Sequence, residues 1–170
     1  PDYYAYVDDH VRRLAEAAGP GVAVLIVSDH GARAMQGAFA INRWLIEQGD
    51  LVMNRPPGEA VALDPADIAW DRTRAWADGG YHARVWINLA GREPSGCVPA
   101  DGLEAYRADL AARLEATRDE SGRPLGTQVV WPHRTYSRLR GIPPDLLVYF
   151  GDLAWRASAL VGPGPVHLRE

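Results

Sequence analysis

The sequence predicts an α/β fold in which a mostly parallel sheet is flanked by helices. Segments with helical spacing of apolar residues alternate along the chain with short aliphatic runs. One run, residues 22–27 (VAVLIV), is continuously aliphatic, which is typical of a strand buried on both faces of a parallel sheet. The chain has 170 residues, of which 47% are hydrophobic, so it is long enough to bury one sizeable core.

In the first half of the chain, we expect a helix over residues 2–18, the buried strand over 22–27, a helix over 39–48 and a short strand over 51–53. The first helix is predicted by apolar residues at every third or fourth position: Tyr4, Val7, Val11, Leu14 and Ala18. Gly19 and Gly49 follow the two helices and favour their ends there. Residues 54–82 lack sustained periodicity, so we expect an irregular excursion near the sheet edge.

In the second half, we expect strands over residues 84–89, 127–131 and 146–150, and a helix marked by Leu103, Tyr106, Leu110 and Leu114. Asp101 and Glu104 have the spacing of a capping box at the start of that helix. The last residues, PVHLRE, resemble the beginning of a strand and stop without a turn. We therefore expect the chain to end in the middle of a fold.

Charge and composition exclude several classes of protein. The net charge is −4, and all 18 basic residues are arginines scattered among carboxylates, which argues against a nucleic-acid polymer as partner. Cys97 is the only cysteine, so the chain has no internal disulfide framework. The sequence contains neither an apolar span of membrane length nor the pattern of a signal peptide. These features predict a cytoplasmic protein without a membrane partner.

Asp29 and His30 stand directly behind the predicted strand at residues 22–27, and Gly31 follows them. In open α/β sheets, ligands gather at the carboxyl ends of strands. Both side chains could reach one ion only where the backbone curls, which Gly31 permits. A carboxylate oxygen and an imidazole nitrogen suit zinc or a similar metal. A solvated polar turn is the alternative that this tripeptide alone leaves open.

Three segments in the same order resemble the C-terminal part of the type I phosphodiesterase/nucleotide pyrophosphatase family, within the alkaline phosphatase superfamily. They are VSDHGARAMQGAFAINRWLIEQGDLVM, WDRTRAWADGGYHARVWINLAGREPSG and PPDLLVYFGDLAWRASALVG. The resemblance implies that residues 1–170 are the C-terminal portion of a single alkaline-phosphatase-like α/β domain, incomplete in this chain. It covers nearly the whole chain.

The resemblance also implies a site. It predicts a metal-dependent phosphoesterase that acts on a small phosphorylated substrate through two divalent metal ions, most often zinc. By motif match, Asp29 and His30 are two ligands of the metal that also holds the nucleophile. The nucleophile, Thr or Ser, is expected upstream of this chain, as are most of the remaining ligands, with a last histidine expected downstream. No catalytic residue is therefore expected within this chain. The fragment alone is expected to be inactive, and an exposed sheet edge could let it self-associate.

Other polar residues are expected to be structural. His167 falls inside a predicted strand, His82 follows a loop, and His10 and His133 are expected to be solvated or structural. Ser28 has no general base placed beside it and is not expected to be a nucleophile. We expect Arg92 and Glu93 to brace a turn, and Asp145, Trp155 and Arg156 to be packing and capping residues. A non-catalytic scaffold or binding segment of the same fold, or a sulfatase or phosphomutase relative, is the alternative function.

Overall fold

The computed structural model describes residues 2–169. The chain divides between Ala32 and Arg33 into two compact units, which are described separately. Among the described residues, no helix is both long and apolar enough to cross a membrane.

The first unit contains the predicted helix and lacks the predicted strand. Helix α1 spans Asp2–Ala18, as expected, and none of its residues is buried. Residues 22–27 do not form a strand, and the side chains of Leu25 and Ile26 are 85% and 84% exposed. The prediction of a buried strand is wrong for this chain, because no described segment pairs with its backbone to form a ladder.

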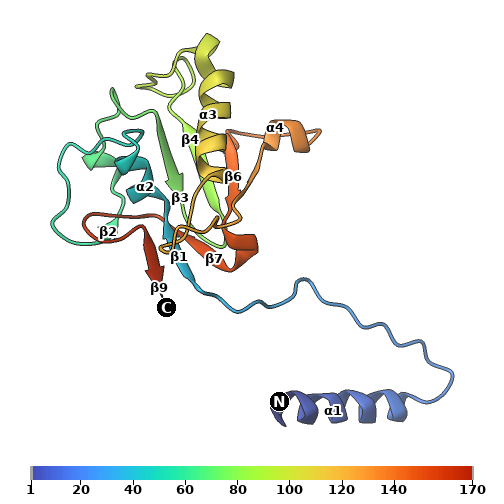
Figure 1. Cartoon of the computed structure of the whole chain (residues 1–170). Coiled ribbons are helices and arrows are strands. Elements are labelled where there is room, and N and C mark those ends of the chain that lie inside the picture. The colour runs from blue at the N-terminus through green and yellow to red at the C-terminus, as the bar shows by residue number, and fades with distance from the viewer. Residues whose placement is uncertain (1, 170) are drawn as a thin grey trace. The chain divides into compact units, whose positions relative to one another are not determined.

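The second unit holds the other elements (Figure 1). They are β1 (Gly37–Ala40), α2 (Ile41–Glu47), β2 (Val61–Ala62), β3 (Ala75–Asp78), β4 (Ala83–Ile87), α3 (Leu103–Glu115), β5 (Gln128–Val130), α4 (Pro132–Thr135), β6 (Leu146–Tyr149), β7 (Trp155–Ser158), β8 (Leu160–Val161) and β9 (His167–Arg169). Short 3-10 turns lie at Pro65–Asp67, Ala100–Gly102 and Gly151–Leu153.

The strands of the described residues form three small sheets, and only the sheet that contains β1 combines parallel and antiparallel pairs. Their orders are β7-β1-β9, β2-β8 and β3-β4-β6-β5. Only the β1–β7 pair is parallel, whereas the other ladders of the described residues are antiparallel. The α/β class is confirmed, but the expectation of a mostly parallel sheet is wrong for this chain. Antiparallel pairing prevails instead: β3 and β4 form a hairpin, and β6 pairs with both β4 and β5.

Three local predictions differ from the structure. The second helix begins at Ile41 and not at residue 39, because Gly37–Ala40 pairs with β7 and β9 as the central strand β1. Strand β3 lies inside the stretch expected to be irregular, and its four residues are too few to show a period in the sequence. The predicted capping box is absent: Gly102 is the N-cap of α3 and no side chain caps it, while Glu104 pairs with Arg107.

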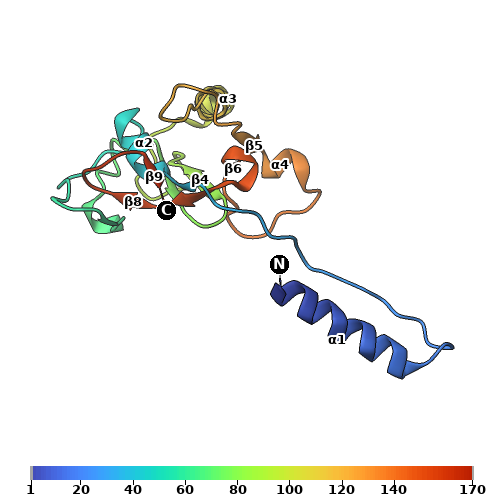
Figure 2. The same ribbon diagram turned by 60° about the horizontal axis from the view of Figure 1, so that its bottom comes forward.

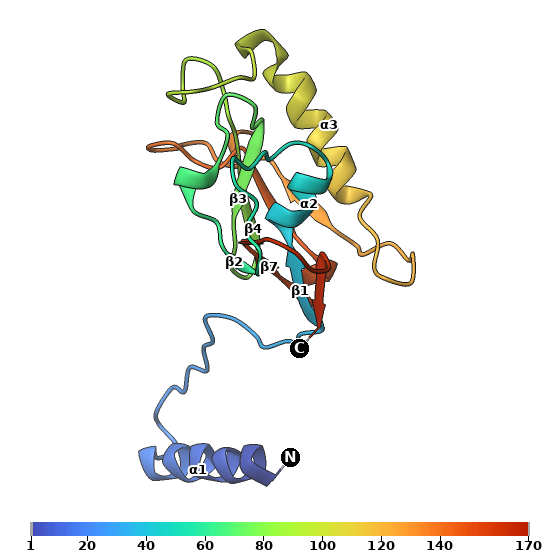
Figure 3. The ribbon, with the colours of Figure 1, turned by 90° about the vertical axis from the view of Figure 1, so that its left-hand side faces the viewer.

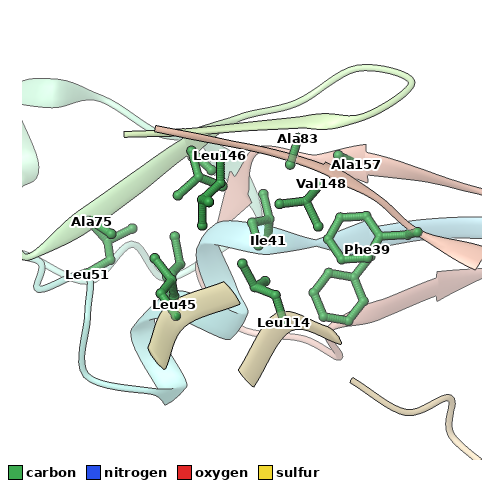
Figure 4. Close-up of a cluster of buried hydrophobic side chains, with 14 of the residues drawn as sticks. Phe39, Ile41, Leu45, Leu51, Ala75, Ala83, Leu114, Leu146, Val148 and Ala157 are labelled. Carbon is green, nitrogen blue, oxygen red and sulfur yellow. The ribbon is translucent and has the colours of Figure 1, made fainter. Parts of the chain in front are cut away.

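The main core lies between the helices and the sheets. Helices α2 and α3 lie side by side, with the Arg113 guanidinium 5.8 Å from the centre of the Trp44 ring (Figure 3). Helix α3 packs against β5 and β6, as the view along its axis shows (Figure 2). Buried side chains from both helices meet those of the strands (Figure 4). The rings of Phe39 and Phe150 stack with 4.4 Å between their centres.

Candidate metal-binding site

Asp29 and His30 place a carboxylate oxygen and an imidazole nitrogen, two atom types that can bind a metal, near each other. The carboxylate oxygen Oδ2 of Asp29 lies 3.5 Å from Nε2 of His30, and both side chains are more than three-quarters exposed. Two ligands bound at 2.0 to 2.2 Å in a tetrahedral arrangement stand about 3.3 to 3.6 Å apart. The observed separation therefore fits two ligands of one zinc-sized ion, and the adjacent residues reach the same side of the chain because they are not in a regular strand.

Local hydrogen bonds hold this pair in place. The Nδ1 atom of His30 lies 2.9 Å from the carbonyl oxygen of Gly31. Because a carbonyl only accepts, Nδ1 carries the proton in this contact and the lone pair of the neutral ring is on Nε2. The backbone N–H of His30 donates to Oδ1 of Asp29 at 3.0 Å, and the Ser28 hydroxyl donates to the carbonyl of His30 at 2.6 Å. Metal-ligating histidines characteristically have such a partner on their second ring nitrogen.

Within the described residues, no group of three or more His, Cys, Asp or Glu side chains is arranged to hold a metal ion. Asp29 and His30 therefore offer two potential ligands and no third one beside them among the described residues. On a metal they would leave coordination positions open for other groups.

The other histidines lie in surroundings that explain them without a metal. His82 stacks on Tyr149 at 5.0 Å, and burial together with the charge of Arg84 lowers the pKa of its imidazole. His133 lies 5.7 Å from the Trp131 ring, and Nδ1 of His10 contacts a carbonyl of its own helix at 2.9 Å.

His167 packs as an aromatic residue inside β9. Its ring lies edge-on to Phe39 and Trp155, at 5.4 and 5.6 Å between ring centres. Its Nε2 atom is buried and has no hydrogen-bond partner among the described residues. These contacts give His167 a packing role within the second unit.

Arg92 and Glu93 brace the turn that follows β4. The Nε atom of Arg92 donates to Oε1 of Glu93 at 2.9 Å, and its Nη2 donates to Oδ2 of Asp145 at 2.7 Å. Asp145 also accepts from Arg107 at 2.8 Å and from the backbone N–H of Ile87 at 2.7 Å. Burial alone would raise the pKa of the Asp145 carboxyl, but the hydrogen bonds from Arg92, Ile87 and Arg107 lower it.

A second buried carboxylate, Asp50, was not singled out from the sequence. It is fully buried, and it accepts from the Tyr106 hydroxyl at 2.7 Å and pairs with Arg74 and Arg113 at 2.8 and 2.7 Å. Burial and the neighbouring Asp50 raise the pKa of Tyr106. Only the Gly49 turn signal precedes Asp50 in the sequence, and its partners are 24 residues or more away, so no local pattern marks this network.

Comparison with known proteins identifies the family. The sequence model of the type I phosphodiesterase / nucleotide pyrophosphatase family matches residues 1–158, a range that includes Asp29, His30, Arg92 and Asp145. The chain matches no curated protein and no solved structure. Since the matched range covers most of the 170 residues, the chain belongs to the type I phosphodiesterase / nucleotide pyrophosphatase family.

Proposed function

We propose that this chain is part of a metal-dependent phosphoesterase that hydrolyses a small phosphorylated substrate with two divalent ions, most consistent with zinc. The observation that carries the proposal is the Asp29–His30 pair, whose Oδ2 and Nε2 atoms stand 3.5 Å apart in a member of this family. The net charge of −4 favours a small substrate over a nucleic-acid polymer.

The residues of this chain would hold one of the two ions, with their ligand atoms directed toward it. Asp29 supplies a hard oxygen ligand, and the contact from His30 Nδ1 to the Gly31 carbonyl directs the Nε2 lone pair toward the same ion. When bound, the two ions would activate the nucleophile and stabilise charge on the phosphoryl group. A complete two-metal site needs about six protein groups, counting the nucleophile, Asp29 and His30. We propose that the Thr or Ser nucleophile and the remaining ligands lie outside these 170 residues.

This proposal predicts weak zinc binding and no turnover by the 170-residue chain alone. A two-ligand shell loses most of the coordination energy of a complete site. Titration calorimetry with zinc is expected to show no tight stoichiometric binding. A stoichiometric complex of high affinity would contradict the idea that the other ligands lie elsewhere.

The decisive experiment uses a protein that joins this chain to the nucleophile and the remaining ligands. We expect Asp29→Asn and His30→Ala each to lower the bound metal, measured by elemental analysis, from two ions toward one and to lower phosphodiester hydrolysis at least about 100-fold. Asp9 and His10 form a second adjacent Asp-His pair, within helix α1, and provide the matched control. The same substitutions there should leave metal content unchanged. Equal effects in both pairs, or two ions retained in the Asp29 and His30 variants, would refute the assignment.

A non-catalytic scaffold or binding segment is the second candidate, because the described residues contain no cluster of three potential ligands. The residues encoded outside this chain distinguish the two functions. An upstream Asp together with Thr or Ser supports the phosphoesterase. A modified Cys or Ser in the nucleophile position instead indicates a sulfatase relative, and the absence of any such group supports the scaffold.

A further inference from the structure

A small cavity in the second unit is lined by none of the residues assigned to metal binding. It has a volume of about 250 Å³ and is lined by Trp70, Trp76, Asn88, Glu93, Pro94 and Ser95. These residues come from the segment before β3, from β3 itself, and from the turn after β4. Small-molecule sites usually have volumes of about 300 to 1,000 Å³, so this cavity suits a single small ring.

Two indoles form perpendicular walls of the cavity. The ring centres of Trp70 and Trp76 are 5.0 Å apart, and their planes meet at 89°. The Nε1 atom of Trp70 donates to the carbonyl of Pro65 at 3.0 Å, and Trp76 stacks against Trp86 at 6.2 Å. Both rings are therefore fixed by neighbours that lie outside the cavity.

Asn88 connects the segments that line the cavity. Its side chain is buried, and Nδ2 lies 2.7 Å from the carbonyl of Trp70, 2.8 Å from that of Thr73 and 3.0 Å from that of Ser95. One amide thus joins the Trp70 segment to the turn that carries Ser95. A cavity whose walls are fixed in this way loses little conformational entropy when it binds a ligand.

The polar groups of the cavity suit hydroxyl groups better than ions. Arg92 donates to Oε1 of Glu93 at 2.9 Å and so neutralises the carboxylate, while Oε2 accepts no hydrogen bond from the described residues. A neutralised carboxylate attracts a free cation weakly but still accepts a hydrogen bond from a hydroxyl. The Ser95 hydroxyl and the Trp76 indole N–H, which make no hydrogen bond within residues 2–169, are available as donors.

We propose that this cavity binds a pyranose ring. The C–H groups of such a ring are weakly positive and pack against the negative face of an indole. Its hydroxyls match the acceptor on Glu93 and the donors on Ser95 and Trp76. The recognition chemistry is that of a neutral sugar, and it does not depend on the metal binding proposed for Asp29 and His30.

Saturation-transfer NMR with methyl glucopyranosides and galactopyranosides tests the proposal on the whole 170-residue chain. A ligand of this size is expected to bind with a Kd on the order of millimolar. Trp76→Leu is expected to weaken binding at least about tenfold, because the substitution removes one aromatic wall of the cavity. Trp131→Leu is the matched control, because Trp131 is a half-buried indole that does not line the cavity and whose ring contacts His133 instead of Trp70 or Trp76. Its Kd should stay within about twofold of the unmodified chain.

A second variant guards against misfolding of the first. Ser95→Phe fills the cavity from an exposed turn, and we expect it to abolish binding while circular dichroism stays unchanged. The proposal is overturned if no pyranoside receives saturation, or if Trp76→Leu and Trp131→Leu weaken binding equally. It is also overturned if tetramethylammonium displaces a bound pyranoside at a lower concentration than a second pyranoside does, because the cavity would then be a site for organic cations.

Discussion

Replacing Asp145 by Asn tests how strongly the buried ion network stabilises the second unit. Asp145 is 4% exposed, and its two oxygens accept from Arg92 at 2.7 Å and Arg107 at 2.8 Å. An amide keeps the shape but removes the charge, and its NH₂ group must face one of the two arginines. Removing one partner of a buried ion pair costs about 3 to 5 kcal/mol because the other charge is left uncompensated. We expect a loss of that size in the free energy of unfolding.

Urea unfolding followed by circular dichroism measures this loss as a lower midpoint at unchanged slope. Asp78→Asn is the control, because Asp78 pairs with Arg84 where both side chains are about half exposed, and such pairs contribute about 0 to 1 kcal/mol. If Asp145→Asn falls within about 1 kcal/mol of the unmodified protein, or matches Asp78→Asn, the network does not stabilise the fold as argued.

The same carboxylate gives a pH dependence of defined sign. Hydrogen bonds lower the pKa of Asp145 in the folded state, whereas the unfolded carboxyl has a pKa of about 3.9. A depressed folded-state pKa contributes stability above the unfolded pKa, and that contribution is lost as the pH falls through the folded pKa. The difference in stability between the unmodified protein and Asp145→Asn should therefore shrink below about pH 4.

Three further outcomes are expected. His167→Phe should raise the free energy of unfolding by about 1 kcal/mol in thermal melts, because Nε2 is buried without a partner; a lower Tm would contradict this. Gly96→Ala should destabilise the fold strongly, since its Cβ would lie 2.1 Å from the Leu89 carbonyl oxygen. Gly122→Ser should destabilise it less, because a side chain at Gly122 meets open space, although the backbone φ there is +81°. Because residues 22–27 are exposed and aliphatic, the chain should self-associate in sedimentation experiments and Ile26→Lys should weaken this; a monomer at all concentrations would refute it.

The sequence predicted elements whose signals are local and repeated. Helix α1 matches its predicted bounds, and α3 follows the stripe from Leu103 to Leu114. Strands β5 and β6 lie within the predicted ranges and β4 begins one residue before its predicted start, because aliphatic runs and turn residues mark these strands. Strand β3 was missed, since a short strand next to a turn owes its existence to its partner β4 and not to a pattern of its own.

The strand predicted over residues 22–27 shows the opposite limit. Its aliphatic, β-branched composition is that of a buried strand, yet a strand exists only where another backbone pairs with it. The described residues offer no such partner, so the segment is extended and exposed. A strand-like composition therefore shows that a segment can pair, but the segment forms a strand only where another backbone lies beside it.

The two candidate sites depend on the sequence in different ways. The geometry of Asp29 and His30 arises from contacts within residues 28–31, so it could be inferred from a four-residue motif and exists without long-range packing. The cavity depends on Asn88, which reaches Trp70 across 18 positions, and on Arg92, which reaches Asp145 across 53 positions. Arg92 thus links the ion network to Glu93, and the charge that stabilises the fold also neutralises the carboxylate in the cavity. Only the folded chain brings these groups together.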